Sequence, residues 1–152
     1  MASLDKWYMS LALKLAREAS LRGEVPVGAV LVVEGKIAGW GRNDRMSKNN
    51  ILGHAELLAL QQASETIQNW RLMRSTLYVT LEPCIMCTGA LLQSRVNRVV
   101  FGCRDAKMGA VRSLYALAED PRLNHRITIE EGIFAEESAA LLRNFFENLR
   151  SR

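Results

Sequence analysis

The chain has 152 residues, of which 49% are hydrophobic and 24% charged, and its formal net charge is +4. These values fit a single globular domain over residues 1–152 and exclude a disordered chain. No apolar run approaches the roughly 20 residues of a membrane span, and the first residues do not show the pattern of a secretory signal. We therefore expect a cytoplasmic protein with no membrane association. The positive charge suits a nucleic-acid partner, although many basic proteins bind none.

The first part of the chain alternates between helical and strand patterns. Before a stop at Gly23, apolar residues recur at helical spacing, namely Tyr8, Leu11, Ala12, Leu15 and Ala19. Residues 27–33 form a β-branched run typical of a buried strand, and residues 37–42 follow a tight turn as its hairpin partner. The polar residues 43–50 predict a loop, and residues 53–68 have helical composition.

The second part of the chain continues this alternation. We expect strands at 76–81, 96–101 and 126–129, a loop at 103–109, and helices at 85–93, 113–118 and 135–149. Strands that alternate with helices favour an α/β sandwich of three layers. The first two strands should pair as a hairpin, whereas the later strands are separated by helices and should run parallel. The prediction is a mixed five-stranded sheet flanked by helices.

Two short motifs carry the strongest chemical signal, His54-Ala55-Glu56 and Pro83-Cys84-Ile85-Met86-Cys87. Residues three apart share one face of a helix, so Cys84 and Cys87 can point at one metal ion. Both lie where a helix begins, and the positive end of the helix dipole favours thiolates there. With His54 as a third ligand, the set predicts one zinc ion per chain, because zinc accepts thiolate and imidazole in a tetrahedral shell.

Glu56 is predicted to work beside the metal without binding it. Three protein ligands leave the fourth zinc position open for water, which is the pattern of catalytic rather than structural zinc. Glu56 can then take a proton from that water and pass it to a ring nitrogen of the substrate. A zinc site of His and two Cys with a non-ligand Glu is typical of nucleobase deaminases.

Other interpretations of these motifs stay open. A Cys-x-x-Cys pair alone would fit a structural zinc half-site or a redox pair, but the remaining candidates, Cys103 and His125, form no second ligand pair. An inactive, zinc-stabilised RNA-binding module would have no use for Glu56. A deaminase of free guanine, cytosine or a nucleoside on the same fold remains a competing hypothesis.

Several further stretches make the chain resemble the bacterial tRNA-specific adenosine deaminases from about Trp7 to Arg150. They are Glu24-Val25-Pro26-Val27-Gly28-Ala29-Val30, Leu77-Tyr78-Val79-Thr80-Leu81-Glu82 before the Cys motif, Val99-Val100-Phe101-Gly102, Asp105-Ala106-Lys107, Gly109-Ala110, Asn124-His125-Arg126 and Phe145-Phe146. The resemblance implies a cytidine-deaminase-like fold and a homodimer. It also implies conversion of adenosine to inosine at the wobble position of a tRNA anticodon loop. Action on another single-stranded nucleic acid, such as DNA, stays open as an alternative.

The same resemblance implies roles for individual residues. Val27 and Asn43 would line the base pocket. Asp105 and Lys107, in the loop at 105–109, would hold nucleotides that flank the target, and Phe146 and Arg150 would contact the anticodon loop. From the residues alone, Asn43 could instead cap a turn and Asp105 could be a loop acid or a helix cap. The C-terminal cluster of Arg143, Arg150 and Arg152 could equally be a solvated helix face.

Overall fold

A mixed five-stranded sheet lies at the centre of the fold, which a computed structural model describes for residues 2–151. The strands are β1 (Gly28–Val33), β2 (Lys36–Arg42), β3 (Ser75–Leu81), β4 (Arg98–Cys103) and β5 (Thr128–Glu131), in the spatial order β2-β1-β3-β4-β5. The β1–β2 hairpin is antiparallel, and the pairs β3–β4 and β4–β5 are parallel, as expected. The pair β1–β3 is also antiparallel, so β1 is antiparallel to both of its neighbours.

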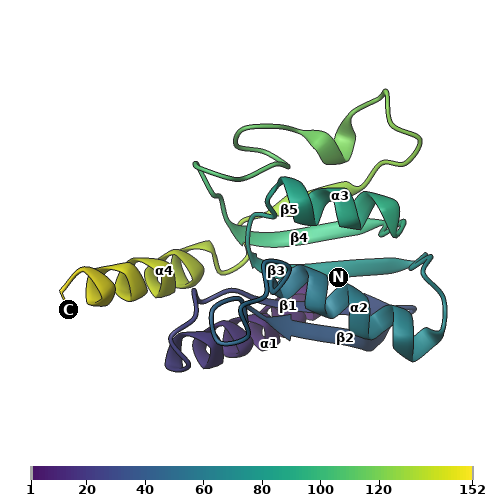
Figure 1. The fold of residues 1–152 in the computed structure, drawn as a ribbon. Coiled ribbons are helices and arrows are strands. Elements are labelled where there is room, and N and C mark those ends of the chain that lie inside the picture. Colours follow the sequence, from purple (N-terminus) through teal and green to yellow (C-terminus); the bar gives the residue numbers. More distant parts are fainter. Residues whose placement is uncertain (1, 152) are drawn as a thin grey trace.

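Helices cover both faces of this sheet and make the expected three layers (Figure 1). They are α1 (Ala2–Leu21), α2 (Ala55–Ile67), α3 (Ile85–Gln93) and α4 (Ala135–Arg150), with a 3-10 turn η1 (Leu117–Glu119). Alternate residues of β1 belong to different cores: Leu31 packs with α2, whereas Val30 and Val32 pack with α1. This alternation is what a strand buried on both faces requires.

The packing of α2 against β2 depends on two glycines. A Cβ atom at Gly39 would lie 2.2 Å from the carbonyl oxygen of Ala59, and one at Gly41 would lie 2.3 Å from that of Ala55. Any other residue at either position would force the helix away from the sheet. The glycines therefore fix where α2 lies, and with it the residues at the start of the helix.

Three of the predicted elements need correction. The helix expected at 113–118 is wrong: only Leu117–Glu119 is helical, as a 3-10 turn, because the amides of Val111, Arg112 and Ser113 donate to the buried Glu82 carboxylate. The strands expected at 96–101 and 126–129 each begin two residues later. Val96 is fully buried but lies before β4, so its apolar side chain made the predicted strand start too early. Within residues 2–151, none of the helices is both long and apolar enough to cross a bilayer.

A buried ion pair joins α1 to the sheet. The Arg98 guanidinium donates hydrogen bonds of 2.9 and 2.7 Å to the two carboxylate oxygens of Asp5, and the Tyr78 hydroxyl donates a third of 2.7 Å. Arg98 also donates to Glu130 at the sheet edge. The hydrogen bonds from Arg98, and that from Tyr78 to a smaller degree, hold the pKa of Asp5 below its usual range.

We expect Asp5→Asn to lower the free energy of unfolding by about 2 kcal/mol, because it removes the charge that the partly buried Arg98 guanidinium binds with two hydrogen bonds and leaves Glu130 as its remaining ion-pair partner. The folded-state pKa of Asp5 is depressed, so its stabilisation is present above the ordinary carboxyl pKa and is lost as the pH falls through the folded value. Urea unfolding at several pH values should show the difference between parent and variant shrinking in acid.

The matched control is Glu34→Gln, which removes a surface ion pair with Arg74 whose side chains are 61% and 79% exposed. We expect it to change stability by no more than about 1 kcal/mol. Equal losses in the two variants would contradict a special role for the Asp5–Arg98 pair.

Candidate metal and active site

His54, Cys84 and Cys87 converge at one end of the sheet. His54 is the residue before α2, Cys84 is the residue before α3, and Cys87 lies in the first turn of α3. The His54 Nδ1 atom lies 3.7 Å from the Cys84 sulfur and 3.4 Å from the Cys87 sulfur. The three potential ligand atoms lie within 4.8 Å of one another, so this cluster could hold a metal ion.

The surroundings of this cluster favour one deprotonated sulfur. The thiol of Cys87 beside it lowers the pKa of Cys84 to about 4, and His54 acts in the same direction. The pKa of Cys87 is raised, chiefly because its thiol is hydrogen-bonded to Cys84. A Cys84 thiolate at the start of a helix is a ready metal ligand.

Glu56 lies in the first turn of α2, two residues after His54. Its side chain is only 4% exposed, and burial raises the pKa of its carboxyl group to about 7. A carboxyl group with a pKa near neutrality can both accept and return a proton at physiological pH. Glu56 therefore has the properties of a general acid–base residue.

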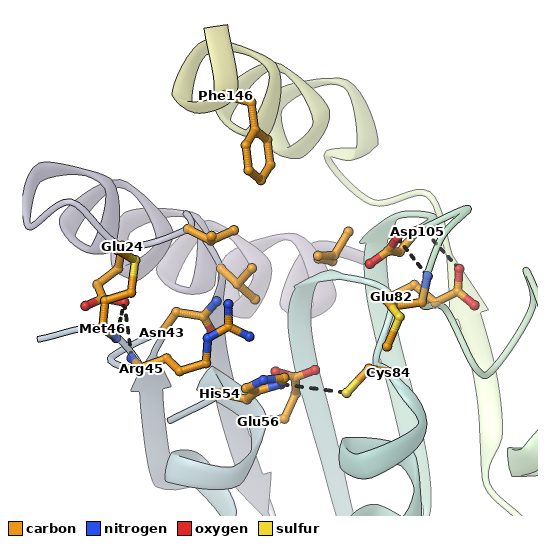
Figure 2. Close-up of a pocket in the computed structure, with 14 residues that line it drawn as sticks. Glu24, Asn43, Arg45, Met46, His54, Glu56, Glu82, Cys84, Asp105 and Phe146 are labelled. Atoms are coloured by element: carbon orange, nitrogen blue, oxygen red, sulfur yellow. Dashed lines mark hydrogen bonds between the residues drawn. The ribbon is translucent and has the colours of Figure 1, made fainter. Parts of the chain in front are cut away.

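His54, Glu56 and Cys84 form the floor of a cavity of about 310 Å³, and Cys87 is buried outside its lining (Figure 2). Both residues expected at the base pocket, Val27 and Asn43, line it. The side-chain oxygen of Asn43 accepts a hydrogen bond of 2.9 Å from the Ala55 amide at the start of α2. Asn43 thus satisfies an amide at the start of α2 rather than capping a turn of its own, and it also lines the cavity.

Asp105 and Phe146 line the same cavity from other elements. Asp105 stands across the cavity from Asn43, and Phe146 points down into the opening from α4 (Figure 2). The Asp105 carboxylate also accepts the amides of Lys107 and Met108 at 3.1 and 3.2 Å, which stabilises its own loop.

The other two predicted contact residues, Lys107 and Arg150, lie outside this cavity. They line an adjoining groove of about 690 Å³ between the loop at 104–108 and α4, and Phe146 borders both spaces. Arg143 also lines the groove, whereas Arg152 lies outside the described residues. The groove thus has basic residues on both sides, with Asp105 and Glu147 as its acids.

Two buried glutamates that the sequence interpretation did not single out shape the cavity walls. The Glu24 carboxylate, 2% exposed, accepts the backbone amides of Arg45, Met46 and Ser47. On the opposite wall the Glu82 carboxylate, also 2% exposed, accepts the amides of a second loop, those of Asp105, Val111, Arg112 and Ser113. Both glutamates adjoin apolar runs in the sequence, which is the one signal of burial that they carry.

Cys103 and His125 do not join the metal cluster. The Cys103 sulfur lies 3.8 Å from the carbonyl oxygen of Thr80, and His125 Nε2 lies 2.7 Å from that of Val96. Of the cysteines and histidines, only His54, Cys84 and Cys87 form a possible metal-binding group within residues 2–151. A structural site with four protein ligands from these residue types is therefore absent from the described part of the chain.

Comparison with known proteins identifies relatives over nearly the whole chain. The model of the MafB19-like deaminase family matches residues 3–150. The tRNA-specific adenosine deaminase of Haemophilus influenzae is 45% identical over 98% of this chain and 87% of its own length. That of Bacillus subtilis is 43% identical over 97% and 92%, respectively.

Solved structures show the same fold. A structure from a study of A-to-I editing by tRNA:A34 deaminases at the wobble position of transfer RNA superposes with a TM-score of 0.85 and 39% identity, covering 89% of this chain and 98% of that one. A guanine deaminase from Nitrosomonas europaea superposes with a TM-score of 0.75 and 25% identity, covering 92% and 83%.

Proposed function

The chain belongs to the tRNA-specific adenosine deaminases, and from this membership we propose that it converts adenosine to inosine at the wobble position of a tRNA anticodon loop. The overall reaction consumes water and releases ammonia. One observation carries the proposal: His54 and Cys84, which form a possible metal-binding group with the fully buried Cys87, line a single cavity together with the buried Glu56. We also propose that it acts on this tRNA substrate in the cytoplasm.

The cluster suits zinc. Zinc–nitrogen bonds of about 2.0 Å and zinc–sulfur bonds of about 2.3 Å at a tetrahedral angle put the two ligand atoms roughly 3.5 Å apart. The nitrogen–sulfur separations here are 3.7 and 3.4 Å, on either side of that value. A zinc ion held by these three residues would supply a water molecule whose pKa is lowered from about 16 to about 7.

Glu56 carries the proton transfers in this proposal. Its carboxylate takes a proton from the attacking water and delivers it to a ring nitrogen of adenine. It then passes the second proton of that water to the departing amine, so that ammonia leaves and the base becomes hypoxanthine. A carboxyl pKa of about 7 suits both directions of transfer.

The cavity and its groove favour an unpaired nucleotide within a strand. The target amine is hidden in a duplex, so the enzyme must take an extruded or unpaired base. With the Asn43 oxygen held by the Ala55 amide, the Asn43 amino group can donate to a base. The basic groove along Lys107, Arg143 and Arg150 can follow the flanking phosphates.

We further propose that two copies of the chain form a homodimer through α2 and α3. A groove between these helices is lined mainly by apolar side chains, with Gln61, Ser64, Gln93 and Ser94 as its polar residues. Leu52 and Trp70 in this lining, and Ile85 at the start of α3, are each about half exposed. Exposed apolar patches of this kind mark protein–protein contacts.

Sedimentation at micromolar concentration should therefore give twice the chain mass of 17.1 kDa. We expect Trp70→Glu to shift the protein toward monomer, because it would bury a charge in the contact. Trp7→Glu is the control, since Trp7 is equally exposed but lies on α1, across the sheet from α2 and α3. A parent protein that sediments only as monomer would rule out the dimer.

Metal analysis should find one zinc per chain. We expect Cys84→Ala and Cys87→Ala to lose the zinc and to unfold at lower temperature, because each removes one of three protein ligands. Cys103→Ala removes the third cysteine, which lies outside the cluster, and should keep its zinc. Full zinc occupancy in either ligand variant would refute the assignment of that residue.

Deamination is tested with an anticodon stem-loop RNA that carries adenosine at the wobble position, with products identified by mass. We expect the parent to form inosine and Glu56→Gln to keep zinc but lose about 10²–10⁴-fold in rate. Glu65→Gln, on the exposed side of the same helix, should be as active as the parent.

The same assay separates the competing substrates. The DNA counterpart of the loop, free adenosine and free guanine are assayed in parallel. Turnover of free bases or nucleosides that equals turnover of the RNA would replace the proposal with a small-molecule deaminase. Glu56→Gln activity within about tenfold of the parent would show that another group carries the proton.

A further inference from the structure

Arg45 is the single lysine or arginine among the fourteen residues that line the active-site cavity. No carboxylate within residues 2–151 lies at ion-pair distance from its guanidinium group. The nearby acids have other partners, because Glu24 and Glu82 are bound to the backbone amides of the two wall loops. The cavity therefore contains one cation whose hydrogen-bond donors are free for a ligand.

The backbone that carries this cation is held firmly. The Arg45 amide donates to Glu24 at 3.1 Å, and the next two amides donate to the same carboxylate at 3.1 and 2.8 Å. The Arg45 carbonyl oxygen accepts the amide of Asn50 at 2.9 Å, which closes the loop. Arg45 is thus displayed from a fixed backbone, and less conformational entropy is lost when a ligand binds it.

Depth within the cavity indicates which part of a nucleotide Arg45 would meet. Glu56 at the floor is 4% exposed, His54 is half-buried, and Arg45 is exposed. The Arg45 side chain extends from its loop toward the space above His54, beside Asn43 (Figure 2). A base that reaches Glu56 fills the floor, so the ribose and its phosphates stay at the level of Arg45.

We propose that Arg45 binds a phosphate group adjoining the target nucleoside, and thereby selects a nucleotide within a strand over a free nucleoside. The planar guanidinium matches phosphate oxygens with two parallel hydrogen bonds, which an ammonium group cannot form. This inference rests on the proposed deamination of RNA and names the residue that recognises the target nucleotide's own backbone.

The first test compares zinc-loaded parent, Arg45→Gln, Arg45→Lys and Lys48→Gln on the anticodon stem-loop RNA. We expect Arg45→Gln to raise KM about tenfold, the loss typical of one charge-assisted contact, with little change in kcat. The slope of the logarithm of its RNA-binding constant against the logarithm of the salt concentration should become shallower by about 0.7, the value for one phosphate contact on a single strand. The KM of Arg45→Lys should lie between those of the parent and Arg45→Gln, because lysine keeps the positive charge but cannot form the two parallel hydrogen bonds of the guanidinium group.

Lys48→Gln is the matched control. Lys48 lies in the same loop, its side chain is 69% exposed and 3.7 Å from the carboxylate of Asp44, and it does not line the cavity. Removing its charge should change KM by less than about twofold, as expected for a solvated surface charge. If Lys48→Gln raises KM as much as Arg45→Gln does, general attraction rather than a specific contact explains the effect, and the proposal is wrong.

The second test removes the charge from the RNA instead. Stem-loops with a neutral methylphosphonate on the 5′ or the 3′ side of the target adenosine are assayed with parent and Arg45→Gln. For one of the two linkages, the neutral group should raise the KM of the parent by about the factor that Arg45→Gln raises it on unmodified RNA. The KM of Arg45→Gln should not change further when that linkage is neutral.

The outcomes of these tests distinguish failure of the phosphate contact from failure of the proposed function. A parent that deaminates the stem-loop while Arg45→Gln matches it overturns the phosphate contact alone. An Arg45→Gln defect that persists in full on both neutral linkages shows that Arg45 contacts the base or the fold instead, and also overturns it. A parent with full zinc that leaves every stem-loop unchanged overturns the proposed function and this inference together.

Discussion

The meeting of two helix starts is the constraint on which the site depends. His54 precedes α2 and Cys84 precedes α3, so the ligands come together only if both helices begin at the same end of the sheet. Gly39 and Gly41 set the position of α2 by letting its backbone touch β2. The parallel pairing of β3 and β4 sets the position of α3, which is the crossover between them. The close packing of the helices on the sheet therefore determines whether His54 and Cys84 meet.

The two loops that form the walls of the cavity are each held by a buried carboxylate from another segment of the chain. Glu24 holds the loop after β2, and Glu82 holds the loop after β4. Carboxylates take several amide donors at once, so each can order a stretch of backbone that has no regular secondary structure. The backbone bonds of Glu82 work with Ser113 to lower its pKa against the opposing effect of burial. The two walls are therefore tied to the fold separately and not to each other.

The sequence predicts most of this arrangement, and the failures have a common cause. Helical and alternating patterns located all four helices and the five strands, and the motif spacing located His54, Cys84 and Cys87. The helix expected at 113–118 fails because Glu82, some 30 residues earlier in the chain, takes amides that a helix would have used. Glu24 was missed for the same reason. Its role comes from contacts between distant segments, and no local pattern encodes such contacts.

The last helix, α4, is buried near its start and exposed near its end. In α4 the described buried residue is Ser138, in its first turn, whereas Phe146 and Arg150 near its end are exposed. Substitutions at such exposed positions usually change folding stability by no more than about 0.5 kcal/mol. Substitutions at the end of α4 should therefore leave the sheet and the cluster of His54, Cys84 and Cys87 intact. An enzyme built in this way can acquire new targets while its reaction stays the same.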